Sequence, residues 1–134
     1  MQVPINYLAV LVAAIANCII ATVWYAALFG KTWQKLTGIT DMKPAPMNVA
    51  LVFIGSLVLS FVLDHSIIFG NAYFHMAGVG GGLMGGFFGW LGYIAPVTLS
   101  TKSFEKKPWG LWLLDNAFWL IALLVMGVIL SSWT

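Results

Sequence analysis

Four long runs of apolar residues dominate this chain and limit what it can fold into. They cover about residues 5–29, 47–69, 77–99 and 109–133. Each run is long enough for a helix of about 20 residues, which crosses a hydrocarbon core about 30 Å thick. The runs are continuous and do not alternate with polar residues, as the strands of a membrane β-barrel would. We therefore predict an all-α membrane protein in which residues 1–134 form a single domain of four transmembrane helices.

Charged residues are scarce, and their positions predict the orientation of the helices. They make up 7% of the chain, against roughly 25% of a soluble domain, so lipid is the expected partner of the surface. All 6 basic residues are lysines, and they lie in the connections 30–46 and 100–108. The positive-inside rule places both connections in the cytoplasm, which gives two antiparallel hairpins with both termini outside. Such scattered lysines form no basic stripe, so we expect no nucleic-acid partner.

The first connection carries a short amphipathic pattern. Trp33 and Leu36 are three residues apart, while Lys31 and Lys35 fall on the other side of the same helical turn. This pattern predicts a short helix in the headgroup layer. Gly38 is expected to end it, because glycine is the usual residue just past a helix end.

Glycine recurs through the third run at a helical spacing. The residues are Gly78, Gly82, Gly85, Gly89 and Gly92, which are four and three positions apart in turn. This spacing places them on one stripe of a helix, where the missing side chains let another backbone approach closely. Packing within the chain is the favoured interpretation, and an interface between copies or a pore lining remain open.

Asn17 is the polar residue near the middle of the first run. An amide within lipid needs a hydrogen-bond partner, because no water is there to satisfy it. We expect Asn17 to lock helix packing rather than to bind a ligand.

Asp115 is the main candidate for a functional residue. It lies in the fourth run, about 9 Å beyond Trp109 at a rise of about 1.5 Å per residue. A carboxylate at that depth costs on the order of 2–3 kcal/mol unless it is paired or hydrated, so it should face the bundle. The hydroxyl of Tyr25 or Tyr93, or the amide of Asn116, is a candidate donor to it. The group is then either a proton or cation site open to the cytoplasm or a structural clamp between helices.

Asp64, His65 and His75 cluster in the sequence near the expected outer boundary of the second run. Carboxylate and imidazole are ligands that zinc or copper accepts. Their spacing matches no metal motif, however, and an interfacial pair of this kind is commonly hydrated. We predict no bound metal and no cofactor, and keep these three residues as weak metal candidates.

Several longer strings occur along the chain. They are Leu28-Phe-Gly-Lys-Thr-Trp-Gln-Lys-Leu, Gly89-Trp-Leu-Gly, Ala95-Pro-Val-Thr-Leu-Ser, Phe104-Glu-Lys-Lys-Pro-Trp and Leu114-Asp-Asn-Ala-Phe-Trp. With them the chain resembles the DUF1761 family of small bacterial membrane proteins over nearly its whole length. The resemblance implies a four-helix protein of the bacterial inner membrane and implies no activity. Asp115 resembles the acidic or amide position of the family's fourth-helix motif, whereas Asp64, His65 and His75 match no motif of the family.

Two functions fit these observations. The first is an oligomeric channel or carrier for a small solute or ion, with its path between the subunits of a homo-oligomer because a four-helix chain has little interior. The alternative is a non-enzymatic accessory or scaffold protein that packs against partner membrane proteins. We favour the first slightly. An enzyme is the least favoured class, because Asp115 lacks a second acid, base or metal ligand beside it.

Overall fold

All regular structure in the described part of the chain is helical. The computed structural model describes residues 5–38 and 46–133. The elements are α1 (Tyr7–Thr22), η1 (Val23–Leu28), α2 (Gly30–Thr37), α3 (Pro46–Phe74), α4 (Gly78–Gly89), η2 (Trp90–Ile94), α5 (Ala95–Phe104) and α6 (Trp109–Ser132). The segments η1 and η2 are short π-helices. Within these residues 4 continuous helical stretches are long and apolar enough to cross a membrane, which confirms the predicted number.

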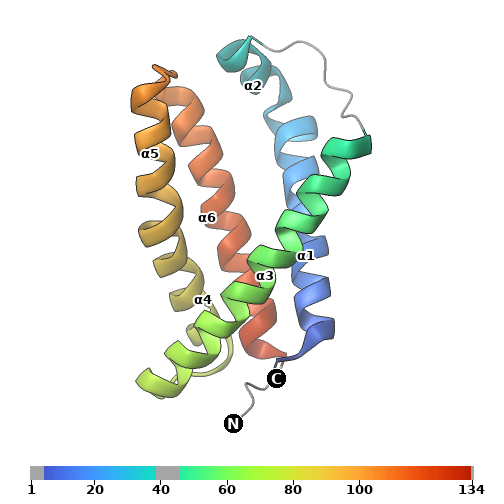
Figure 1. Cartoon of the computed structure of the whole chain (residues 1–134), viewed down its shortest axis with the longest axis vertical. Coiled ribbons are helices and arrows are strands. Elements are labelled where there is room, and N and C mark those ends of the chain that lie inside the picture. Colours follow the sequence, from blue (N-terminus) through green and yellow to red (C-terminus); the bar gives the residue numbers. More distant parts are fainter. Residues whose placement is uncertain (1–4, 39–45, 134) are drawn as a thin grey trace.

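Helix α6 is the central element of the bundle. It packs against α1, α3 and α4, and Figure 1 shows α3 crossing obliquely over α1 and α6. The core lies where these helices meet, and it contains Leu123, Met126 and Leu130 of α6 together with Ala13 of α1 and Ile67 of α3. Large residues on α6 thus face a small one on α1, which lets the two backbones approach.

Helix α2, with Lys31 and Lys35, and the turn from α5 to α6, with Lys106 and Lys107, lie at one end of the bundle. In Figure 1, α2 and the turn from α5 to α6 lie at the top, whereas the start of α1 and the end of α6 lie at the bottom. A hydrogen bond of 3.1 Å from Asn6 Nδ2 to the Trp133 carbonyl joins the latter two. Residues 39–45 of the connection 30–46 lie outside the described residues. The side of the membrane that each end faces stays a prediction.

Helix α2 confirms the predicted short helix between the first two spans. Its last residue is Thr37, and Gly38 follows in a left-handed conformation with φ of 75°. The Gly38 N–H donates to the Gln34 carbonyl at 2.8 Å, which satisfies one of the carbonyls that a helix end leaves open.

Helix α3 continues five residues beyond the expected end at residue 69. It passes through Gly70 and Asn71 and ends at Phe74, before His75 with φ of 57°. The polar Asn71 does not end the helix, because its Nδ2 donates to Ser131 Oγ of α6 at 3.0 Å. Polarity in the sequence therefore marked a contact inside the bundle and not the start of a loop.

Segment η2 has an identifiable cause in Pro96. Proline has no N–H to donate to the carbonyl of Gly92, and its ring would clash with that carbonyl in a regular α-helix. The chain makes a wider turn there, in which the Ala95 N–H donates to the Trp90 carbonyl. Helix α5 then starts with the proline in its first turn, where a missing N–H costs nothing.

Candidate functional site

Asp115 of α6 and Tyr25 of η1 form the central pair of the candidate site. The Tyr25 hydroxyl donates to Asp115 Oδ1 at 2.6 Å, and both residues are half-buried. The two residues are 90 positions apart in the chain, so only the packing of the first span against α6 brings them together. The pair lies close to α2, because the Trp33 ring of α2 packs against the Tyr25 ring.

Aromatic rings surround the Tyr25 side of this pair. The Tyr25 ring lies 5.3 Å from the ring of Phe118 on α6 and 6.4 Å from that of Trp33 on α2. Segment η1 sets this placement, because the Phe29 N–H donates five residues back to the Trp24 carbonyl at 2.8 Å and so adds one residue to the turn. Short π-helices of this kind are rare and occur frequently at functional sites.

Two indole N–H groups close to this pair in the chain lack acceptors. Trp24 precedes Tyr25, and Trp112 lies one helical turn before Asp115. Each Nε1 is buried and has no hydrogen-bond partner among the described residues. Buried N–H groups are almost always paired, so these two donors can bind an acceptor other than those that the described residues supply.

Asn116 belongs to a second network, on another face of α6. Its Nδ2 donates to Thr98 Oγ1 of α5 at 3.0 Å and to the Trp112 carbonyl at 2.9 Å. Trp90 Nε1 donates to the Asn116 carbonyl at 3.0 Å. Successive residues on a helix point about 100° apart, so Asn116 joins α6 to α5 and η2 while Asp115 faces η1. The amide of Asn116 therefore does not serve as the donor to Asp115.

Tyr93 lies away from Asp115. It is 77% exposed and lines a groove between α3 and the α4–η2 stretch. The sequence placed Tyr93 and Asp115 at a similar depth, but depth does not fix the direction in which a side chain points. In the structure Tyr25 alone of the three candidate donors reaches the carboxylate.

The glycines of the third span face two neighbours. A Cβ on Gly82 would collide with the backbone of Gly127 on α6, whereas a Cβ on Gly85 would come within 2.7 Å of the Ile67 side chain on α3. The other three residues of the predicted stripe make looser contacts: Gly89 lies near Leu63, and a Cβ on Gly78 or Gly92 would meet nothing within 4 Å.

Sequence reasoning missed two glycines of the contact with α6. A Cβ on Gly86 would collide with the Leu123 carbonyl, and Gly127 supplies the α6 side of the contact with Gly82. The spacing of four between Gly82 and Gly86 is itself a small-xxx-small signal. This signal was missed because the predicted stripe continued from Gly82 to Gly85 and Gly89 and left out Gly86.

Asn17 has its partner on α3. Its Nδ2 donates to Ser56 Oγ at 2.7 Å, and both residues are buried. One turn further along α3, Ser60 Oγ donates to the Val10 carbonyl of α1 at 2.9 Å. These two bonds join α1 and α3 through buried polar groups. The side-chain oxygen of Asn17, Oδ1, is buried and has no partner among the described residues.

The three weak metal candidates point in different directions. Asp64 is 3% exposed, inside the bundle. His65 is half-buried and packs its ring on Phe61 at 4.5 Å, and His75 is exposed in the turn after α3. Within the part of the chain that the structure describes, no three His, Cys, Asp or Glu residues are grouped as a metal site would require. Neighbouring residues on a helix diverge, so Asp64 and His65 do not converge on one ion.

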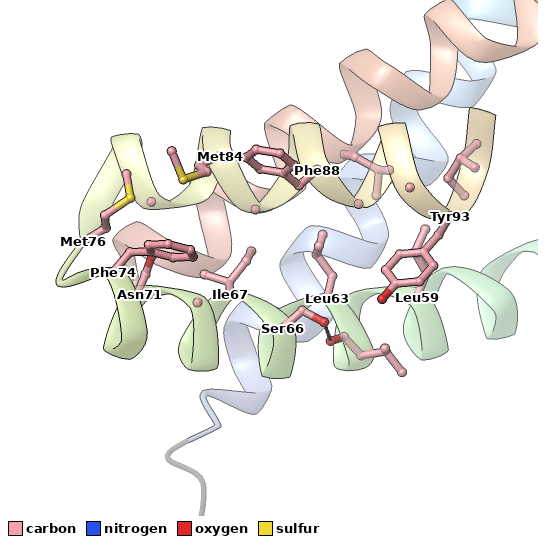
Figure 2. A pocket seen from close by; sticks show the side chains of 18 residues that line it. Leu59, Leu63, Ser66, Ile67, Asn71, Phe74, Met76, Met84, Phe88 and Tyr93 are labelled. Atoms are coloured by element: carbon pink, nitrogen blue, oxygen red, sulfur yellow. Dashed lines mark hydrogen bonds between the residues drawn. The ribbon is translucent and has the colours of Figure 1, made fainter. Parts of the chain in front are cut away.

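A groove lies between α3 and the α4–η2 stretch, and we call it the α3–α4 groove. Its volume is about 580 Å³. Figure 2 shows side chains of α3, such as Leu63 and Ile67, facing those of the opposite helix, such as Met84 and Phe88. The groove does not contain Asp115 or Tyr25.

Comparison with known proteins gives one match. A family model described as a protein of unknown function, DUF1761, matches residues 8–131. No curated protein and no solved structure is significantly similar to the chain. Because the match covers nearly the whole chain, the chain belongs to this family.

Proposed function

We propose that this member of the DUF1761 family is an oligomeric carrier for a small polar solute or ion, and that it binds its cargo at the Asp115–Tyr25 pair. A carboxylate within a membrane span is costly and is a functional group by default. Here it is held by one phenol at 2.6 Å. This half-buried carboxylate, held by a phenol of another span, is the observation that carries the proposal. The buried indole N–H groups of Trp24 and Trp112, which have no acceptor among the described residues, lie near the pair in the chain.

The same pair offers complementary chemistry to such a cargo. Asp115 attracts a cation or accepts a proton, and the aromatic rings around Tyr25 present faces that favour a positive charge. The indole N–H groups match acceptor atoms of the same solute. A small solute with both a cationic and an acceptor group therefore fits best.

The path of the cargo is expected between subunits. The α4–α6 contact is closed by backbone against backbone at Gly82 and Gly127, which leaves no room for a pore there. A homo-oligomer would supply the second wall of the path. In this proposal the lysine-bearing connections face the cytoplasm of a bacterium, by the positive-inside rule, and the Asp115–Tyr25 pair opens to that side of the inner membrane.

Flux into liposomes tests this role. Purified protein is reconstituted with a pH-sensitive dye inside, and proton movement is followed with and without a panel of small amines and amino acids outside. We expect flux with the native chain, a loss of at least about tenfold in Asp115→Asn, which corresponds to about 1.4 kcal/mol, and a smaller loss in Tyr25→Phe.

The matched control is Glu105→Gln. Glu105 is also an acid near this end of the bundle, but it lies outside the spans in an exposed ion pair with Lys107 at 2.8 Å. This variant should retain native flux. Equal flux from the native chain and Asp115→Asn, or no flux from either, would contradict the carrier role.

An accessory role is the second candidate, and the α3–α4 groove favours it. The groove opens sideways between two spans, and its rim carries exposed apolar residues such as Phe74 and Phe88. Such a surface suits contact within the membrane better than passage across it. Absence of flux, together with a defined partner membrane protein at fixed stoichiometry in gentle detergent, would support this role, and purification as the chain alone would count against it.

A further inference from the structure

The α3–α4 groove exists because glycine occupies positions where other residues would fill it. Gly70 of α3 and Gly92 of η2 both line the groove, and a Cβ at either would meet nothing within 4 Å. The helices touch at the floor, where Gly85 packs on Ile67. The groove is therefore formed by the packing of α3 against α4 and by the missing side chains of the glycines that line it.

The lining suits an uncharged occupant. No Asp, Glu, Lys, Arg or His is among the residues that line the groove. Two of its polar side chains already have partners: Ser66 Oγ donates to the Val62 carbonyl at 3.1 Å, and Asn71 Nδ2 donates to Ser131 Oγ at 3.0 Å. An occupant that needs hydrogen bonds would gain few here, whereas a hydrocarbon chain loses none.

The dimensions of the groove match one hydrocarbon chain. It extends from Met76 to Ile94, which is about 27 Å at a rise of about 1.5 Å per residue and close to the thickness of about 30 Å of a hydrocarbon core. Dividing the volume of about 580 Å³ by this length gives a mean cross-section of about 21 Å², so the groove is long and narrow. A helix with its side chains is about 10–12 Å wide, so a whole helix from a second copy would not fit inside it.

One end of the groove presents a group that can bind a phosphate. His75 lies in the turn between the lining residues Phe74 and Met76, and its side chain is exposed. An imidazole donates a hydrogen bond, and when protonated it carries a positive charge. The residues that line the groove carry no charge, so we place the headgroup at the end next to His75.

We propose that the α3–α4 groove is a binding site for one acyl chain of a membrane phospholipid, with the lipid phosphate beside His75. The groove lies between two helices that are long and apolar enough to cross a membrane (Figure 2), so in a bilayer the acyl chain would enter it sideways from the lipid. Dispersion contacts with both helices replace those that an empty groove would lose. The proposal is independent of Asp115 and of the carrier role.

Native mass spectrometry tests the proposal with a defined lipid. The protein is purified in mild detergent, incubated with palmitoyl-oleoyl phosphatidylglycerol and transferred to the gas phase. We expect one retained lipid per chain. Gly92→Leu and Gly70→Leu place a side chain in the groove and should each lower the retained fraction at least tenfold.

Gly55→Leu is the matched control for both variants. Gly55 is also a glycine of a membrane span, its Cβ would meet nothing within 4 Å, and it does not line the groove. This variant should retain lipid as the native chain does. Equal lipid retention in all four proteins would overturn the proposal.

Photo-crosslinking of the native chain gives a readout that needs no groove substitution. The protein is placed in nanodiscs that contain a phospholipid with a diazirine on one acyl chain, and the adducts are mapped. Enrichment on groove residues such as Met84 and Leu59 over the lipid-facing Val49 supports the proposal. An even distribution overturns it, and so does a loss of subunit association in Gly92→Leu, because the groove would then be an interface between copies.

Discussion

The contact between Gly82 and Gly127 gives the sharpest stability prediction for this fold. A Cβ on Gly82 would lie 2.5 Å from the Gly127 carbonyl carbon and 2.7 Å from the Val128 nitrogen. Neither atom belongs to a flexible side chain, so α4 and α6 must move apart to admit the methyl group of Gly82→Ala. Close-packed interiors transmit such a shift to their neighbours.

The expected magnitude combines two effects of opposite sign. Alanine is better than glycine in a helix interior by about 0.8–1.0 kcal/mol, which stabilises Gly82→Ala. Overpacking a rigid contact costs about 1–3 kcal/mol, which destabilises it. Gly55→Ala gains the first effect alone, because its Cβ would meet nothing within 4 Å. We therefore expect Gly82→Ala to be about 1–3 kcal/mol less stable than Gly55→Ala.

Unfolding in mixed micelles, followed by circular dichroism as the fraction of denaturing detergent rises, measures this difference. The double variant Gly82→Ala/Gly127→Ala adds a second check. Once the first methyl group has separated the helices, the second should cost less, so the two changes should not add. Equal stabilities of Gly82→Ala and Gly55→Ala would refute the close approach of α4 and α6.

Two further predictions concern the buried hydrogen bonds and use the same assay. Asn17→Ala removes the bond of 2.7 Å to Ser56 and should cost about 0.5–2 kcal/mol; adding Ser56→Ala should then change little, and fully additive effects would speak against their pairing. Thr98→Val keeps the shape of the side chain but removes one of the two acceptors of the buried Asn116 Nδ2 and the hydroxyl beside Asn116 Oδ1, so we expect a cost of about 1–3 kcal/mol. Native stability in Thr98→Val would show that this bond does not hold α5 to α6.

The four spans followed from hydropathy because lipid imposes the same requirement on any chain. Every backbone N–H and C=O must be paired inside the span, and its length must match the bilayer. Composition and spacing therefore sufficed to predict four helices and the short helix that ends before Gly38. The end of α3 was misplaced because Asn71 is polar, and the sequence alone does not say that its amide is paired with Ser131.

The candidate site, too, was predicted from the sequence only in part. The sequence singled out Asp115 and estimated its depth, because residue number along a span translates directly into distance across the membrane. It could not choose between Tyr25 and Tyr93, since these lie at similar depths on different spans. The π turn at η1 and the packing of α2 place Tyr25 beside the carboxylate, and the turn that Pro96 imposes at η2 accompanies the exposure of Tyr93.

The sequence by itself was enough to predict the medium, the number of helices and an expected depth for each polar residue. Only the tertiary structure decided the direction in which each residue points around its helix axis, and hence which glycines meet α6, which line the groove and which donor reaches Asp115. The physical reason is that hydropathy measures transfer from water to lipid, which depends on depth. Contacts between helices that are apolar on all sides depend on local shape and on hydrogen bonds, which appear only when the partner helix is in place.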